Sequence, residues 1–128
     1  MERDRVGSVS ARAACALAGA LLLAACSSHE LYYWGDYEGS VGRVGGRDEG
    51  FDVVAEIDTL ETDLEQAQNS DRPVPPGFHA HLGYLHYLNG NLAGAVNQLE
   101  AEKQRFPESA VFVDALLARI APPPTPAP

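Results

Sequence analysis

The sequence predicts an all-α protein in which a short array of helices follows an extended aromatic segment. Apolar residues recur every three or four positions between residues 53 and 67 and again between residues 110 and 120, which is the spacing of amphipathic helices. Between these stretches, residues 78–107 contain two more helical patterns separated by an Asn-Gly-Asn turn. We therefore expect one helix-turn-helix hairpin flanked by an N-terminal and a C-terminal helix.

Residues 1–25 form a predicted lipoprotein signal peptide. A charged start precedes an apolar run, residues 13–23, that is too short to cross a bilayer as a helix. The run ends in Leu23-Ala24-Ala25-Cys26, the order of a bacterial lipobox. We expect cleavage between Ala25 and Cys26, and a diacylglycerol and a palmitate-type chain on Cys26. The alternative is an ordinary signal peptide with a coincidental cysteine.

The predicted anchor on Cys26 places the protein at the outer membrane, facing the periplasm. The diacylglycerol and the amide-linked chain together supply three acyl chains, which is more than the two that stable membrane attachment needs. Ser27 stands where an aspartate would signal inner-membrane retention in many enteric-type bacteria. The second cysteine, Cys15, lies in the leader, so the mature chain keeps no free thiol for a disulfide, a metal ion or catalysis.

The charge of the mature chain excludes one class of partner. Without residues 1–25 the chain has six basic and sixteen acidic side chains, a net charge of −10. Such a protein repels nucleic acid and anionic lipid headgroups. We expect no nucleic-acid partner.

An aromatic segment follows the predicted anchor. Tyr32, Tyr33, Trp34 and Tyr37 supply three of the five tyrosines and the only tryptophan, a density that is not typical of a flexible linker. Either the rings pack onto the helical body, or they form a partner-binding surface together with Asp36. Tyrosine and tryptophan dominate the energetics of many interfaces.

Glycines mark the end of this N-terminal region, residues 26–47. The run Val41-Gly42-Arg43-Val44-Gly45-Gly46-Arg47 lacks the order of a phosphate-binding loop, and we expect a flexible loop. Asp36 and Glu38 would share one face of an extended strand, a spacing that could support paired-carboxylate chemistry. We favour a solvated acidic face.

Residues 48–120 form the predicted helical domain, whose first helix covers residues 48–68. Its apolar positions are Phe51, Val53, Val54, Ile57, Leu60, Leu64 and Ala67. Its acidic positions are Asp48, Glu49, Asp52, Glu56, Asp58, Glu61, Asp63 and Glu65. We expect these acids to form a solvated face, and a docking surface for a basic partner is the alternative.

Phe78 to Pro107 resembles one tetratricopeptide-type helix-turn-helix repeat. The landmarks are Leu82-Gly83, His86, Gly90, Ala95, Leu99 and Pro107. We expect helices over residues 77–88 and 92–105, with Gly90 at positive φ in the turn and Asn91 capping the second helix. The second helix should bury Leu92, Ala95, Val96 and Leu99 against Leu82, Tyr84 and Leu85. His79 and Glu102 depart from the repeat pattern.

A last helix and a proline-rich tail end the sequence. Ser109 can cap a helix over residues 110–120, whose apolar face is Phe112, Val113, Leu116, Leu117 and Ile120. Residues 121–128 predict an extended, disordered tail. A single repeat with one helix on either side makes a small core, so we expect self-association or a permanently bound partner protein.

The sequence predicts no catalytic or metal site. His79, His81 and His86 are close in sequence, but helical geometry separates them and no zinc-binding order is present. Packing or surface histidines are the interpretation we favour. No nucleophile with a base is recognisable, so we expect no enzyme and no cofactor.

Three motifs carry a family resemblance. They are Leu31-Tyr32-Tyr33-Trp34-Gly35-Asp36-Tyr37-Glu38, Pro75-Pro76-Gly77-Phe78-His79-Ala80-His81-Leu82-Gly83-Tyr84, and Phe106-Pro107-Glu108-Ser109-Ala110-Val111-Phe112. On these the chain resembles the domain of unknown function 4810 family of small bacterial lipoproteins, which has more tyrosines where this chain has residues 42–46. The resemblance implies a lipoprotein often encoded beside a curli-channel-type secretion lipoprotein, and a shared envelope complex. It implies no activity.

Together these features predict a non-enzymatic outer-membrane lipoprotein that binds other envelope lipoproteins or a second copy of itself. The alternative is a periplasmic binding module for a small ligand or cell-wall fragment. Its groove would lie between residues 31–38 and the first helix of the hairpin.

Overall fold

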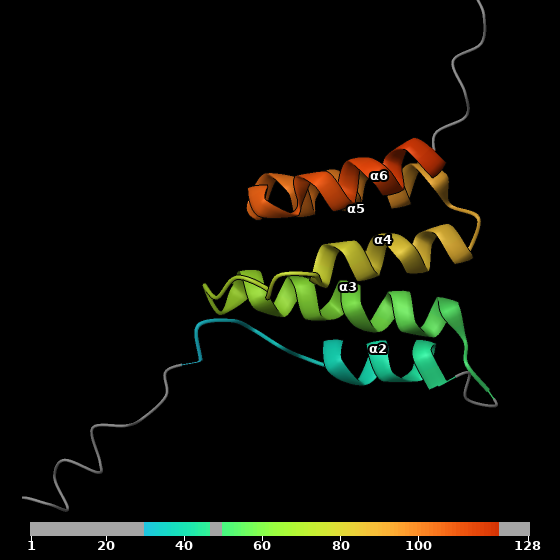
Figure 1. Ribbon diagram of the computed structural model, residues 1–128. Helices are drawn as coiled ribbons and strands as arrows, with labels where there is room; N and C mark the ends of the chain where they lie inside the picture. Colours follow the sequence, from blue (N-terminus) through green and yellow to red (C-terminus); the bar gives the residue numbers. More distant parts are fainter. Residues whose placement is uncertain (1–29, 47–49, 121–128) are drawn as a thin grey trace, which may run out of the picture. The chain divides into compact units, whose positions relative to one another are not determined.

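The computed structural model describes residues 30–46 and 50–120, and every regular element in these ranges is helical (Figure 1). The elements are α2 (Tyr37–Gly46), α3 (Val53–Asn69), α4 (Phe78–Leu88), α5 (Leu92–Arg105), the 3-10 helix η1 (Pro107–Ser109) and α6 (Ala110–Ile120). The predicted all-α fold is confirmed. The predicted signal peptide, the lipidated Cys26 and the proline-rich tail lie outside the described residues.

Helix α3 begins later than its hydrophobic pattern suggested. Asp52 has an extended backbone, and its carboxylate accepts hydrogen bonds from the backbone N–H groups of Val54 at 2.9 Å and Ala55 at 3.3 Å. A carboxylate in this position caps a helix and complements its dipole. The cap therefore starts the helix at Val53 instead of residue 48.

The predicted hairpin of α4 and α5 is present, with bounds within one residue of those expected. Gly90 has a φ of +77° in the turn, and the Asn91 side chain accepts a hydrogen bond from the Gly94 N–H at 2.9 Å. The two helices approach closely at Gly83, where a Cβ would lie only 3.1 Å from the backbone carbonyl oxygen of Ala95.

The core lies where α3, α4, α5 and α6 pack against one another in chain order (Figure 1). Its buried apolar residues are Ile57, Leu60, Ala67, Val74, Phe78, Leu82, Leu85, Ala95, Leu99 and Val113. Leu92 and Tyr84 were expected to be buried, but both are exposed. Leu92 opens α5 beside the turn, and Tyr84 lines a hollow between α4 and α6 that no described side chain fills.

The glycine-rich stretch after the aromatic segment is a helix. The prediction of a flexible loop over residues 41–47 is therefore wrong for residues 41–46, and residue 47 lies outside the described residues. The same finding corrects the expected extended strand, because α2 begins at Tyr37 and contains Glu38. Within the described ranges, no helix is both long enough and apolar enough to cross a membrane.

Candidate interaction surface

The aromatic segment, residues 31–37, is attached by its backbone to the connection between α3 and α4. The Tyr33 N–H donates a hydrogen bond to the Pro73 carbonyl at 2.8 Å. The Arg72 guanidinium lies 5.3 Å from the centre of the Tyr33 ring, within the range of a cation–π interaction. Tyr33 is thereby half-buried and held on both its backbone and its side chain.

A second attachment lies at the turn before α2. The Asp36 N–H donates to the Asp63 carboxylate at 2.7 Å. Gly35 has a φ of +48°, and a Cβ on it would lie 2.2 Å from Asp63 Cγ. Glycine is required here because any side chain would displace the carboxylate that receives the Asp36 N–H.

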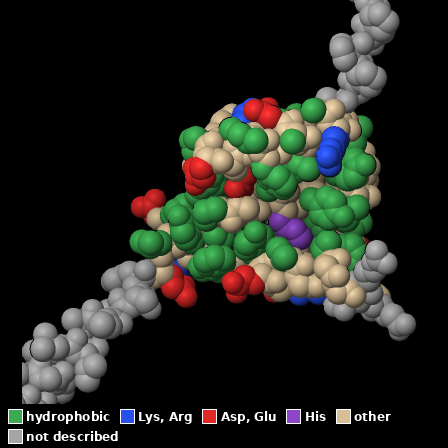
Figure 2. Space-filling model, in the orientation of Figure 1, with side chains coloured by type: hydrophobic (Ala, Val, Ile, Leu, Met, Phe, Trp, Pro, Cys, Tyr) green, Lys and Arg blue, Asp and Glu red, His purple; other side chains and the backbone are tan. Residues whose placement is uncertain are grey.

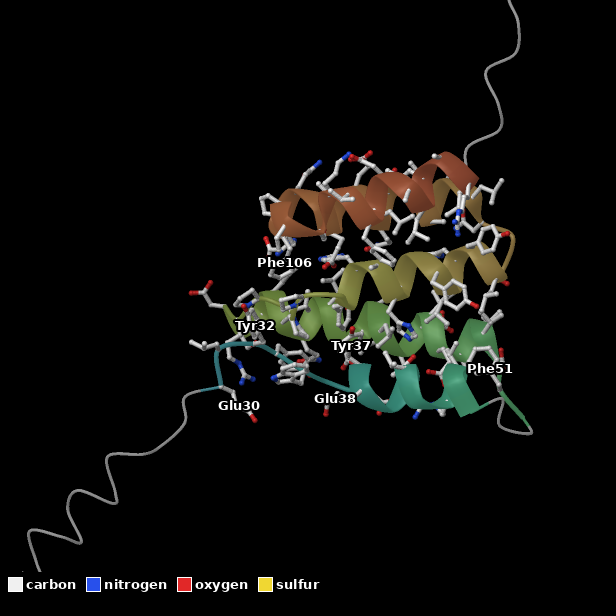
Figure 3. The ribbon with its side chains drawn as sticks, in the orientation of Figure 1. Glu30, Tyr32, Tyr37, Glu38, Phe51 and Phe106 are labelled. Atoms are coloured by element: carbon white, nitrogen blue, oxygen red, sulfur yellow. The ribbon has the colours of Figure 1, made fainter. Side chains whose placement is uncertain are left out.

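Tyr37 joins the segment to the core (Figure 3). Its ring centre lies 5.6 Å from that of Phe78 and 5.8 Å from that of His81, both on α4. Burial, and then the negative charges of Glu102 and Glu38, raise the pKa of the Tyr37 phenol. The phenol therefore stays neutral and joins the segment to the core.

The other rings continue outward from Tyr37 to the surface. Trp34 stacks on Tyr37 with ring centres 6.3 Å apart, and Tyr32 meets Trp34 edge to face at the same separation. Trp34 is 39% exposed and Leu31 is 77% exposed. Part of the segment therefore packs onto the helical body, as the first interpretation expected, and part of it faces solvent. A partner-binding surface stays a prediction. Figure 2 shows that hydrophobic side chains cover much of the face in view.

An arginine-centred cluster holds α2 in place. Arg43 donates to both carboxylate oxygens of Glu56 on α3, at 2.6 and 2.9 Å, and also to the carboxylate of Asp36. The hydrogen bonds to Glu56 and Asp36 raise the pKa of Arg43. The hydrogen bond from Arg43 lowers the pKa of Glu56, whereas burial alone would raise it. The prediction of a fully solvated acidic face is wrong for Glu56, which is buried.

Ser40 and His81 form a second polar contact beneath α2. Ser40 Oγ lies 2.9 Å from His81 Nε2, although the two residues are 41 positions apart in the sequence. A serine beside a histidine is an arrangement that can support nucleophilic chemistry, and no local sequence pattern indicates it because the two residues are far apart in the chain. Ser40 is 0% exposed, however, so a substrate has no access to its hydroxyl. We interpret the pair as a contact that positions α2.

The remaining histidines of α4 have packing roles. His79 is buried with Nδ1 2.7 Å from Gln98 Oε1, and burial lowers its pKa. His86 is buried with Nε2 3.4 Å from a carboxylate oxygen of Glu61. In the part of the chain that the structure describes, no group of three or more His, Cys, Asp or Glu side chains is arranged to hold a metal ion.

Glu102, which departs from the tetratricopeptide pattern, caps α4. Its carboxylate is buried and accepts hydrogen bonds from the N–H groups of Gly77 at 2.6 Å and Ala80 at 3.3 Å. Gly77 has a φ of +90° and no side chain that could cap the helix itself. A long acidic side chain from α5 supplies the missing acceptor, which a small residue could not do.

A family model for a domain of unknown function, DUF4810, matches residues 31–116. The chain belongs to this family. The match begins with the aromatic segment and extends into α6, so it covers the attachments described above. No curated protein and no solved structure matches the chain.

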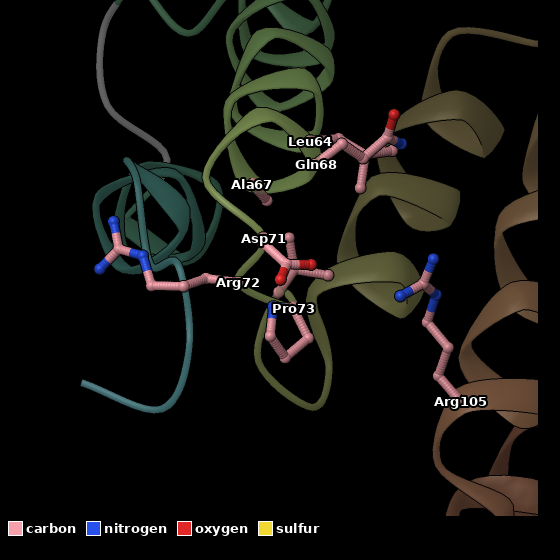
Figure 4. Close-up of a pocket in the computed structure, with 8 residues that line it drawn as sticks. Leu64, Ala67, Gln68, Asp71, Arg72, Pro73 and Arg105 are labelled. Carbon is pink, nitrogen blue, oxygen red and sulfur yellow. The ribbon is translucent and has the colours of Figure 1, made fainter. Parts of the chain in front are cut away.

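Hollows on the surface of this DUF4810 protein include two whose linings contain no residue of the aromatic segment. One, of about 250 Å³, lies at the end of α3 (Figure 4). Its lining residues are Leu64, Ala67, Gln68, Asp71, Arg72, Pro73, Val74 and Arg105. The Arg72 side chain is directed from this hollow toward the N-terminal segment (Figure 4). The other, of about 160 Å³, lies between α4 and α6.

Proposed function

We propose that this protein is a non-enzymatic lipoprotein of the outer membrane, facing the periplasm, that binds another envelope lipoprotein through its aromatic segment. A curli-channel-type secretion lipoprotein is the candidate partner. The observation that supports this proposal is the pair Leu31 and Trp34, which are exposed on a segment whose neighbouring residues are attached to the helical body.

Attachment of the segment favours binding for a physical reason. Association costs free energy for every side chain and loop that must be ordered. Hydrogen bonds at Tyr33 and Asp36 and the packing of Tyr37 order this segment before a partner arrives. Trp34 then presents a large ring of the kind that most often carries binding energy at the centre of an interface.

The predicted lipid anchor supports the same function by restricting the choice of partner. Only residues 27–30 separate Cys26 from the aromatic segment. Fully extended, four residues reach roughly 14 Å, so the segment would stay near the membrane surface. A partner held at the same membrane would meet it at a high effective concentration.

The test is capture of the protein from detergent-solubilised membranes, comparing Trp34→Ala with Phe112→Ala. Phe112 is a matched control because it is an exposed aromatic residue, 59% accessible, on a different element, α6. We expect the wild type and Phe112→Ala to recover a lipoprotein partner in stoichiometric amounts. Trp34→Ala should lose at least about 30-fold in affinity, as for a hot-spot residue worth about 2 kcal/mol.

Two results would contradict the proposal. One is recovery of the wild-type protein alone as a monomer. The other is equal loss of the partner in both variants, because that would place the contact elsewhere or show a general loss of the fold. Circular dichroism of each variant distinguishes a contact that lies elsewhere from a loss of the fold.

Binding of a small ligand is the second candidate function, and the hollow of about 250 Å³ at the end of α3 is the observation in its favour. Ligand pockets ordinarily measure about 300–1,000 Å³, so this hollow is small for a muropeptide. Chemical-shift changes at Ala67 and Val74 on adding muropeptides would support ligand binding, and their absence would leave the interaction module as the better proposal.

A further inference from the structure

The hollow of about 160 Å³ between α4 and α6 has the lining of a binding groove. Its walls are Ala80, Tyr84 and Tyr87 on α4, Leu99 on α5, and Leu116, Arg119 and Ile120 on α6. Tyr84 and Tyr87 are 45% and 46% exposed. Arg119 is the charged side chain among them.

This chemistry suits a proline-rich segment. Proline rings pack on aromatic and aliphatic walls, and a polyproline II segment is already extended, so its binding costs little conformational entropy. Its backbone carbonyls have no internal hydrogen-bond partner and need donors from outside. Tyrosine hydroxyl groups and an arginine at the edge of an apolar groove supply such donors.

The chain itself contains such a segment, which follows the groove-lining helix α6 in the sequence. Residues 121–128 read Ala-Pro-Pro-Pro-Thr-Pro-Ala-Pro, which includes five prolines. They begin at the residue after Ile120, and Ile120 lines the groove. No other run of three consecutive prolines occurs in the sequence.

The length of the segment fits the groove. Leu116 and Ile120 are one helical turn apart, so the groove follows α6 for roughly 6 Å. A polyproline II helix advances about 3.1 Å per residue, so three prolines span this length. Attachment to Ile120 would raise the effective concentration of the segment to the millimolar range.

We propose that Pro122-Pro123-Pro124 of the same chain docks in the groove between α4 and α6. The proline rings pack on Tyr84, Tyr87 and Leu116, and Arg119 donates hydrogen bonds to tail carbonyls. This is a different surface from the aromatic segment, and the inference does not depend on the function proposed for that segment. It replaces the expectation of a disordered tail for these three residues.

Fluorine NMR of the full chain labelled with 3-fluorotyrosine tests the docking. The five tyrosines give separate probes, with the signals of residues 84 and 87 assigned through Tyr84→Phe and Tyr87→Phe. Changing Pro122, Pro123 and Pro124 together to Ala should shift the signals of residues 84 and 87. Tyr32, Tyr33 and Tyr37 should keep their signals, because they lie on the aromatic segment.

A control variant and a dilution series define the outcomes. Pro126→Ala with Pro128→Ala alters the tail beyond the proposed contact and should leave the signals of residues 84 and 87 unchanged. Unchanged signals in the Pro122–Pro124 variant would overturn the proposal. Signals that move on dilution of the wild type would also overturn it, because they would show that the tail of a second copy occupies the groove.

Discussion

At the scale of single residues, two glycines of the N-terminal region have opposite roles. Gly35 has a φ of +48°, and a Cβ there would overlap the Asp63 carboxylate, whereas a Cβ on Gly42 would meet nothing within 4 Å. Gly42 lies inside helix α2 and is exposed. One glycine is therefore required by geometry, and the other only weakens the helix that contains it.

This difference predicts opposite effects of the same substitution. Gly35→Ala should lower the free energy of unfolding by about 1–3 kcal/mol, because alanine is strained in the left-handed region and its Cβ displaces Asp63. Gly42→Ala should raise it by up to about 1 kcal/mol through better helix propensity. Urea unfolding of the two variants measures both values, and a free energy of unfolding that is not lowered in Gly35→Ala would contradict the role given to Gly35.

Some residue roles follow from local pattern and others do not. Gly90 and Asn91 act as predicted because a turn and a helix cap are decided within a few neighbouring residues. The acidic sequence neighbours of Glu56 predict a solvated face, but the residue is buried. Its partner Arg43 comes from a separate helix, and no local pattern indicates that pairing.

At the scale of elements, α2 shows how packing overrides propensity. It contains Gly39, Gly42, Gly45 and Gly46 within ten residues, and each glycine costs about 1 kcal/mol relative to alanine inside a helix. An isolated helix of this length would not form in water. Contacts to α3 and α4, from Arg43 to Glu56 and from Ser40 to His81, supply what the local sequence lacks.

The contact beneath α2 makes stability depend on pH. Burial lowers the pKa of His81 below its ordinary value of 6.5, while the neighbouring Glu56 carboxylate opposes this shift. The unfolded chain therefore takes up a proton more readily than the folded one as the pH falls through about 6.5. Stability is full above this pH and decreases below it, by about 1.4 kcal/mol for each unit by which the pKa is lowered.

We accordingly expect a lower free energy of unfolding at about pH 5.5 than at about pH 7.5. His81→Gln should show a smaller decrease, because glutamine does not titrate. A part of the decrease should persist in this variant, since burial also lowers the pKa of His79. Urea unfolding at both pH values measures these differences, and an equal decrease in wild type and variant would exclude His81 as a source.

At the scale of the whole molecule, the helices pack in chain order, and no other described helix covers the outer side of α6. Val111 and Phe112 on α6 are 86% and 59% exposed. The chain therefore has uncovered apolar side chains on α6 as well as on the aromatic segment. That so small a core needs a partner or a second copy stays a prediction.

The location of the whole molecule depends on one predicted modification. Cys26→Ser should abolish acylation and release the protein from the membrane fraction, because three acyl chains supply the attachment. Incorporation of an azido-palmitate label and fractionation of the envelope measure the two effects. Cys15→Ser is the matched control and should change neither the acylation nor the membrane retention. Membrane retention of Cys26→Ser would contradict the lipid anchor.

Local sequence patterns are enough to predict the helical class, the bounds of α5 and α6, and the turn between α4 and α5. These features arise from periodicity and capping within a few residues, which a linear pattern records. The family match also rests on sequence. Only the tertiary structure decided that residues 41–46 are helical, that Glu56 is buried, and that Tyr33 and Tyr37 are anchors while Trp34 faces solvent. Each of these depends on a contact between residues far apart in the chain, where burial and pairing outweigh local preference.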